Sequence, residues 1–278
     1  MDVREGRLGI YPCLVAGSGT PLVMLAGLLP EAGVAAGPMR RTHERSMMPW
    51  AKNHEVFYVN RRPGMARGMT MAEIAAEHAE GIRQTFAGPV DLMGMSTGGS
   101  IAQQIAAEHP DVVRRLVLVS TGCRLGPPAR SVQRRVAARI RAGAFGKASA
   151  VFAADLSPRG PLALLAGVAG RVLGPRWLPA EGLNDTATMV EAEDDFDLAH
   201  LPAIAAPTLL VAGGRDRYYG RDILTETAAL IPDCRLEIST HMGHVSVLWD
   251  PRAVAQVFTF LGAAELPQGD PQATAASK

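Results

Sequence analysis

Short apolar segments alternate with longer amphipathic segments along most of this chain, and this alternation constrains the possible fold more than any other feature of the sequence. Each apolar segment ends at a glycine or a polar residue. Strands that are covered on both faces are apolar at nearly every position, so these segments predict buried parallel strands. The predicted strands are residues 21–27, 55–60, 90–94, 116–120 and 208–213.

The segments between these strands carry helix signals. Thr70 and Glu73 form a possible capping box and predict a helix over residues 71–86. A second helix is predicted over residues 100–109, because Pro110 stops it there. Strands that alternate with helices build a mostly parallel central sheet with helices on both faces, so the predicted fold class is α/β.

The alternation is interrupted in the second half of the chain. Val132, Val136 and Ile140 recur four residues apart, which is typical of one apolar helix face. Residues 162–173 and 184–194 are two further candidate helices. We expect a helical insertion that caps the carboxyl edge of the sheet, where open α/β sheets bind ligands.

These patterns divide the chain into three parts. The α/β core is expected to comprise residues 1–122 and 200–265, and the helical cap residues 123–199. Residues 266–278 are rich in Pro, Gln, Ala and Asp, so we expect a loose tail there. One large core with an insertion accounts for a chain of 278 residues.

Charge and cysteine content exclude several classes of protein. The 28 Lys and Arg residues nearly balance the 27 Asp and Glu residues, which argues against nucleic-acid binding and favours a small-molecule partner. The three widely spaced cysteines suit neither a disulfide framework nor a metal site. A charged N-terminal stretch and short apolar runs argue against a signal peptide and a membrane span. We therefore expect a cytoplasmic protein that binds no membrane.

The segment Gly94-Met95-Ser96-Thr97-Gly98 matches the pattern G-x-S-x-G. Where this pattern joins a strand to a helix, a tight turn exposes the serine hydroxyl as a nucleophile. The match alone is weak, because so short a pattern also arises by chance. Here it follows a predicted strand and precedes a predicted helix, which favours a nucleophile elbow at Ser96.

A serine nucleophile needs a base that takes its proton and an acid that orients the base. Asp216 follows the predicted strand 208–213, and His244 follows a short predicted strand over residues 235–238. The chain order Ser, Asp, His is the one expected for such a site on an α/β sheet. We therefore predict a triad of Ser96, Asp216 and His244.

Two other acids and one other histidine compete for these roles. Asp194 and Asp197 are alternatives to Asp216, and His241 is an alternative to His244. We favour Asp216 because it lies just past a strand end. We favour His244 because the glycine before it allows a close approach to the elbow.

Acyl transfer also needs backbone N–H groups that bind the oxyanion. Thr97 directly follows the nucleophile and is expected to supply one of them. The second is expected from Leu28, which follows the first predicted strand, where Gly27 leaves the backbone room to turn.

Apolar and aromatic side chains near these residues are candidates for the lining of a substrate pocket, because ligand sites are mostly apolar. Each of them is equally compatible with an ordinary core position. The candidates are Met95, Trp177, Tyr218, Tyr219, Met242 and Trp249.

With these motifs the chain resembles the α/β-hydrolase superfamily. Residues 96–104 run to His109 and Pro110 and then to the apolar run 115–119, which is similar to small, capped serine hydrolases of the esterase, lactonase and cofactor-free haloperoxidase type. The resemblance covers nearly the whole chain except the insertion and the tail. It implies the α/β-hydrolase fold, with a mostly parallel central sheet, helices on both faces and a helical cap insertion.

Three other segments bear on this resemblance. Phe196 and Asp197 resemble the family's return from cap to sheet, which implies a structural role for Asp197. Residues 60–64 look like a degraded form of the family's Asp-x-Arg-Gly-x-Gly loop. The chain departs from the family at Ala26, which stands before Gly27 where the family usually has the histidine of a His-Gly pair that braces the oxyanion loop.

Together these features predict hydrolysis of a carboxylic ester or lactone of a small, largely apolar metabolite through an acyl-enzyme on Ser96. No metal and no organic cofactor is expected. Thioester, amide and carbon–carbon bond cleavage use the same triad. A second class also stays open, namely a ligand-binding or biosynthetic protein that promotes a non-hydrolytic or carbon–carbon bond reaction in the same pocket.

Overall fold

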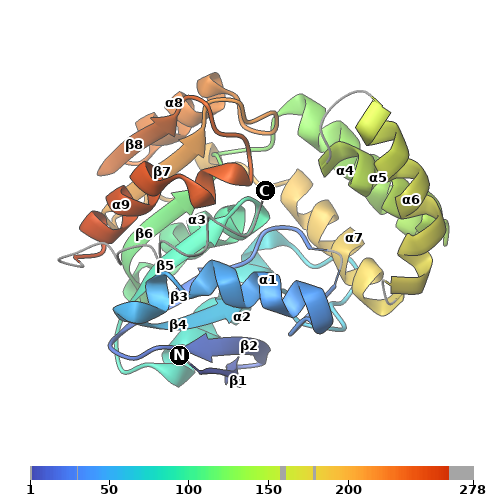
Figure 1. Ribbon diagram of the computed structural model, residues 1–278. Coiled ribbons are helices and arrows are strands. Elements are labelled where there is room, and N and C mark those ends of the chain that lie inside the picture. Colours follow the sequence, from blue (N-terminus) through green and yellow to red (C-terminus); the bar gives the residue numbers. More distant parts are fainter. Residues whose placement is uncertain (1, 30, 157–160, 178–179, 263–278) are drawn as a thin grey trace, which may run out of the picture.

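The computed structural model describes residues 2–29, 31–156, 161–177 and 180–262. An eight-stranded sheet runs through the described part, in the order β1-β2-β4-β3-β5-β6-β7-β8 (Figure 1). β2 pairs antiparallel with β1 and β4, and all other neighbours are parallel. The strands are β1 (Val3–Leu8), β2 (Tyr11–Ala16), β3 (Thr20–Leu25), β4 (His54–Val59), β5 (Val90–Met95), β6 (Val113–Val119), β7 (Thr208–Gly213) and β8 (Cys234–Ser239).

Helices cover both faces of this sheet, as the strand pattern predicted (Figure 1). One face packs against α2 (Met71–Thr85), α3 (Thr97–Glu108) and α8 (Arg221–Leu230), and the other against α1 (Gly37–Met47) and α9 (Pro251–Phe260).

Successive residues of each central strand enter opposite cores, which explains why these strands are apolar throughout. In β6, Leu116 and Leu118 contact the core on the side of α3, whereas Val117 and Val119 contact the core on the side of α9. A strand buried on both faces needs an apolar side chain at every position. The α/β prediction is therefore confirmed.

The predicted capping box is present at the start of α2. The Thr70 hydroxyl accepts the N–H of Glu73 at 3.2 Å, and the Glu73 carboxylate accepts the N–H of Thr70 at 2.8 Å. Both bonds satisfy N–H groups that have no partner within the helix.

Six of the described strands and α-helices were not predicted, namely β1, β2, α1, α5 (Phe145–Leu156), α8 and α9. β1 and β2 precede the first predicted strand; β1 forms the edge of the sheet and is mostly exposed and partly charged, whereas β2 lies inside it and is mostly buried. α1 has only His43 and Met47 buried, so its apolar face is too narrow to detect. α5 lies in the insertion. α3 also begins three residues earlier than predicted, at Thr97.

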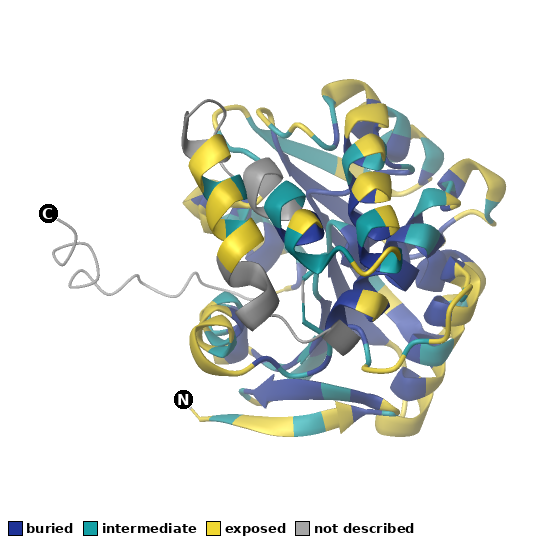
Figure 2. Ribbon diagram, turned by 90° about the vertical axis from the view of Figure 1, so that its right-hand side faces the viewer, coloured by how far each residue is buried: buried dark blue, intermediate teal, exposed yellow. Residues whose placement is uncertain are grey.

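The described part of the insertion between β6 and β7 contains the α-helices α4 (Pro127–Arg141), α5, α6 (Pro161–Trp177) and α7 (Ala180–Asp194), which lie beside the carboxyl edge of the sheet (Figures 1 and 2). Val136 and Ile140 of α4, Ala148 of α5, and Leu183 and Val190 of α7 form a small core of their own. The predicted domain boundaries stay a prediction, and the predicted tail lies outside the described residues.

Within the described segments, no helix combines the length and the apolar character that a bilayer crossing requires.

Candidate active site

Ser96 forms a sharp turn between β5 and α3. Its backbone has φ 51° and ψ −123°, a conformation that is rare for a residue with a side chain. Glycines on both sides make the turn possible: a Cβ at Gly94 would lie 2.4 Å from the carbonyl oxygen of Gly98, and one at Gly98 would lie 2.3 Å from that of Leu25. The structure therefore explains each glycine of the G-x-S-x-G pattern by steric need.

The three predicted triad residues lie within hydrogen-bonding distance of one another. His244 Nε2 is 3.0 Å from Ser96 Oγ, and His244 Nδ1 is 2.8 Å from Asp216 Oδ2. Asp216 follows β7 and His244 follows β8, so both lie at the carboxyl edge of the sheet beside the elbow. This is the geometry that a base needs to take the serine proton.

The Asp216 carboxylate is fixed by main-chain donors. Its Oδ1 accepts the N–H groups of Tyr218 at 2.8 Å and Tyr219 at 3.3 Å, and its side chain is fully buried. The other oxygen faces the imidazole. A carboxylate held in this way orients the ring and keeps the Nδ1 proton on the side away from the serine.

His244 is also held through its backbone, by a residue that the sequence did not reveal. The hydroxyl of Ser120, at the end of β6, donates to the His244 carbonyl at 2.6 Å. Ser120 has φ 48° and is completely buried. Ser120 is the last residue of a predicted strand and belongs to no recognisable motif, so the sequence contains no signal for this role.

The residues that competed for the roles of Asp216 and His244 lie in other environments. Asp197 caps the short helix η3 (Leu198–His200) by accepting the Ala199 N–H at 3.0 Å. Asp194 pairs with Arg134 at 2.6 Å. His241 is exposed in a turn.

The two segments that carry the predicted oxyanion residues meet at the elbow. Thr97 is the first residue of α3, so its N–H is one of the helix-start donors that lack an intrahelical acceptor. A Cβ at Gly27 would lie 3.4 Å from Ser96 Cβ, which means that the loop leading to Leu28 passes directly against the nucleophile. Leu28 itself is half-buried and lines the neighbouring pocket.

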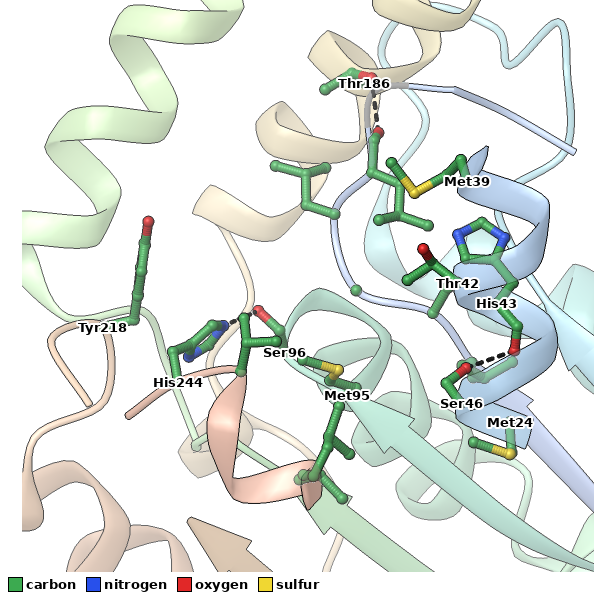
Figure 3. Close-up of a pocket in the computed structure, with 18 of the residues that line it drawn as sticks. Met24, Met39, Thr42, His43, Ser46, Met95, Ser96, Thr186, Tyr218 and His244 are labelled. Atoms are coloured by element: carbon green, nitrogen blue, oxygen red, sulfur yellow. Dashed lines mark hydrogen bonds between the residues drawn. The ribbon is translucent and has the colours of Figure 1, made fainter. Parts of the chain in front are cut away.

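A pocket of about 480 Å³ opens beside Ser96 and His244. Figure 3 shows Ser96 directed toward His244, with side chains of α1 lying across the pocket from them. Methionine and aliphatic side chains dominate the lining, which suits an apolar ligand. The lining comes from the strand ends, α1 and the cap, and includes Met24, Met39, Thr42, Met95, Val136 and Leu183.

The predicted lining residues separate into three groups. Met95, Tyr218 and Trp249 line the pocket. Tyr219 and Met242 do not: Tyr219 is almost completely buried behind His244, with its ring centroid 6.0 Å from the imidazole, and Met242 packs against the core beneath. The side chain of Trp177 lies outside the described residues.

The contribution of α1 to the pocket was missed. His43 stacks on Tyr58 with ring centroids 4.8 Å apart, and burial lowers the pKa of His43 to about 4, so the ring is neutral at neutral pH. Thr42 and Ser46 place two hydroxyls along the same helix. No sequence signal pointed to these residues, because α1 itself was not predicted.

Glu193, near the end of α7, is a second residue that sequence reasoning missed. Its side chain is fully buried and accepts hydrogen bonds from the hydroxyls of Thr97 at 2.9 Å and Ser100 at 2.8 Å. Burial raises the pKa of Glu193 to about 7. Several acids surround Glu193 in the sequence, and such a run is typical of a solvated helix face, so no pattern distinguished Glu193 from its neighbours.

No cluster of three or more metal-ligating side chains occurs in the part of the chain that the structure describes.

Comparisons with known proteins give a consistent picture. The family model described as "Alpha/beta hydrolase family" matches residues 54–257. The pimeloyl-[acyl-carrier protein] methyl ester esterase of Neisseria meningitidis serogroup B / serotype 15 (strain H44/76) is 30% identical over 215 residues, which are 64% of this chain and 80% of that protein.

Solved structures share the fold at low sequence identity. MGS-M2, an α/β hydrolase enzyme from a Medee basin deep-sea metagenome library, has a TM-score of 0.72 and 16% identity, and 97% of each chain is covered. The enol-lactonase of Burkholderia xenovorans LB400 has a TM-score of 0.64 and 20% identity, with 90% of this chain and 96% of that chain covered.

Proposed function

Because this chain belongs to the α/β-hydrolase family, we propose that it is a serine hydrolase that cleaves a carboxylic ester or lactone of a small, largely apolar metabolite. The observation that carries the proposal is the connected set of Ser96 Oγ, His244 Nε2 at 3.0 Å and Asp216 at 2.8 Å from the same ring, beside an apolar pocket.

In the proposed reaction Ser96 Oγ attacks the carbonyl carbon while His244 Nε2 takes the serine proton. Asp216 stabilises the imidazolium that forms. His244 then returns the proton to the leaving alkoxide, which departs as the alcohol and leaves an acyl-enzyme on Ser96. A water molecule, deprotonated by the same imidazole, attacks the acyl-enzyme, and Ser96 recovers its proton as the acid is released.

The oxyanion that forms in each step requires donors that are already in place. The N–H groups of Thr97 and Leu28 are our candidates. The position of Gly27 against Ser96 supports this assignment, because the loop reaches the elbow although Ala26 replaces the histidine that is usual in the family. A donor of this kind typically contributes about 10² to 10³ in rate.

The pocket and the relatives indicate which esters to test. A lining of methionine and aliphatic side chains favours an aliphatic acyl or alkyl group. The Neisseria relative is named for a methyl ester of an acyl chain attached to a carrier protein. We propose acyl esters as the substrate class, with no nucleic acid or membrane as partner.

The first experiment is labelling with a fluorophosphonate, detected by intact mass, together with turnover of short and medium p-nitrophenyl esters. The unaltered protein should gain one adduct and release p-nitrophenol. Ser96→Ala should lose the adduct and lower kcat by at least about 10⁴, because triad members act as a unit. Ser131→Ala, at an exposed position of α4, should leave both readouts unchanged.

A folded protein that shows neither labelling nor turnover would refute the hydrolase. The second candidate class, a non-hydrolytic or carbon–carbon bond reaction in the same pocket, would then take its place.

A further inference from the structure

One buried acid connects the cap to the nucleophile elbow. Glu193 lies near the end of α7 in the insertion, and its two carboxylate oxygens reach the first turn of α3 in the core. Oε2 accepts the Thr97 hydroxyl at 2.9 Å, and Oε1 accepts the Ser100 hydroxyl at 2.8 Å.

The surroundings of Glu193 are polar but contain little compensation for a charge. Thr97 and Ser100 of α3 and Gln133 of α4 lower the pKa of Glu193 by hydrogen bonding, whereas burial and the neighbouring Asp194 raise it to about 7. The carboxyl also raises the pKa of the buried Tyr219 phenol, together with the larger effect of burial. A buried acid without a paired cation is costly, so packing alone does not explain its presence.

The hydrogen bond from Thr97 connects the Glu193 carboxyl group to the candidate active site. Thr97 is the residue whose backbone N–H is our candidate oxyanion donor, and its side chain is fixed by Glu193. Gln133, which hydrogen-bonds to Glu193, also lines the substrate pocket. A connected path of side chains therefore runs from the pocket and the cap to the oxyanion hole.

We propose that Glu193 is a positioning residue: through the Thr97 and Ser100 hydroxyls it holds the elbow in the geometry that the oxyanion requires, and it makes this geometry depend on the seating of the cap helix α7. This inference rests on the proposed serine hydrolase. Glu193 touches no reacting atom, so it acts only through Thr97 and Ser100.

The charge of Glu193 adds a pH dependence. A neutral carboxyl leaves the oxyanion hole undisturbed, whereas an ionised one places a negative charge near the position where the oxyanion develops. At the effective dielectric constant of about 20 that applies in a protein site, such a repulsion between like charges slows a reaction on the order of tenfold. The kcat of the unaltered protein relative to that of Glu193→Gln should therefore fall by about this factor as the pH rises through about 7, because both proteins need the same neutral His244 base.

The test compares Glu193→Ala, Glu193→Gln and the matched control Glu191→Gln, whose carboxylate pairs with Arg141 near the surface. Two readouts are used: kcat and KM for a p-nitrophenyl ester from pH 6 to 9, and amide hydrogen exchange of the peptide covering residues 94–101. Glu193→Ala should lower kcat at least tenfold with less than a threefold change in KM, and it should speed exchange in that peptide.

Glu193→Gln should recover kcat to within about threefold of the unaltered protein at pH 6.5, and well above pH 7 its kcat should exceed that of the unaltered protein by about tenfold. Glu191→Gln should match the unaltered protein in every readout. If Glu193→Ala does not fold, Thr97→Val removes the same hydrogen bond from the other side while it keeps the backbone N–H, and it should lower kcat in the same way.

Two results would overturn the inference: unchanged kcat with unchanged exchange in Glu193→Ala, or a change in KM alone. Its failure is distinguishable from that of the proposed function. Absence of turnover in the unaltered protein refutes the hydrolase, and hydrogen exchange then still decides whether Glu193 restrains the elbow.

Discussion

Two serines in the described part of the chain have positive φ, and both belong to the candidate site. Ser96 at 51° carries the candidate nucleophile, and Ser120 at 48° holds the His244 carbonyl. A residue with a Cβ pays about 1–3 kcal/mol for such a conformation, and the strain persists only where the surrounding structure enforces it. The strain at Ser120 is therefore explained by a need to place the base.

Ser120→Ala should lower kcat for ester turnover about tenfold, because the His244 backbone loses the hydrogen bond that fixes it. The matched variant is Ser120→Gly, which also lacks the hydroxyl but removes the conformational strain. Both variants should lose the same factor in kcat, whereas urea unfolding should find Ser120→Gly more stable than Ser120→Ala by about 1 kcal/mol. Full activity in either variant would contradict the role of the hydroxyl.

At the scale of single residues, the sequence predicts those site residues that follow a local sequence pattern. Ser96, Asp216 and His244 each lie beside a strand end and were predicted from that pattern, and the structure brings them together. Ser120 and Glu193 follow no such pattern. The Ser120 contact spans 124 positions of the chain, and the two Glu193 contacts span 96 and 93, so no local pattern contains them.

At the scale of elements, α7 is the helix that fixes the cap to the core. Its Asp185 carboxylate accepts the N–H groups of Gly64 at 3.1 Å and Met65 at 2.9 Å. Arg61 donates to the carbonyl of Gly182 at 3.0 Å, and burial lowers the pKa of Arg61 to about 10. The loop that looked like a degraded family motif thus binds the cap.

Asp185→Ala should lower the free energy of unfolding by about 3 kcal/mol, because two backbone N–H groups lose a charged acceptor. KM for the ester should rise, since α7 also supplies Leu183 and Thr186 to the pocket lining. Urea unfolding and steady-state kinetics measure the two effects. Asp195→Ala, an exposed acid just past the same helix, is the control and should change neither quantity. Equal stability of the two variants would show that the Asp185 contact contributes nothing.

Burial separates the predicted central strands from two of the missed elements, β1 and α1. Central strands such as β6 and β7 are buried on both faces, so burial imposes an apolar sequence that is easy to detect. β1 and α1 are half-exposed and keep only one or two buried side chains, so their sequences are dominated by solvent-facing residues. Their positions are set by the sheet edge and the pocket rather than by their own composition.

For the molecule as a whole, buried titratable groups make stability depend on pH in two opposite directions. His78 is completely buried beside Tyr11, and burial lowers its pKa to about 4. Its neutral form therefore stabilises the fold above pH 6.5, and that contribution is lost as the pH falls toward 4. Glu193, with a pKa raised to about 7, has the opposite sign: its protonated form stabilises the fold at low pH, and the contribution is lost as the pH rises through 7.

His78→Gln should therefore flatten the rise of the unfolding free energy between pH 4 and 6.5, by up to about 3 kcal/mol, since each pKa unit corresponds to about 1.4 kcal/mol. Urea unfolding at pH 4, 5, 6, 7 and 8 measures the slope, so a uniform loss of packing at this site does not affect the result. His200→Gln, whose side chain is exposed, should keep the slope of the unaltered protein, and Glu193→Gln should steepen the rise between pH 4.5 and 7. An unchanged slope in His78→Gln would mean that the buried imidazole retains its proton affinity in the fold. The acid sensitivity of the protein would then have to come from the other two buried histidines, His43 and His54.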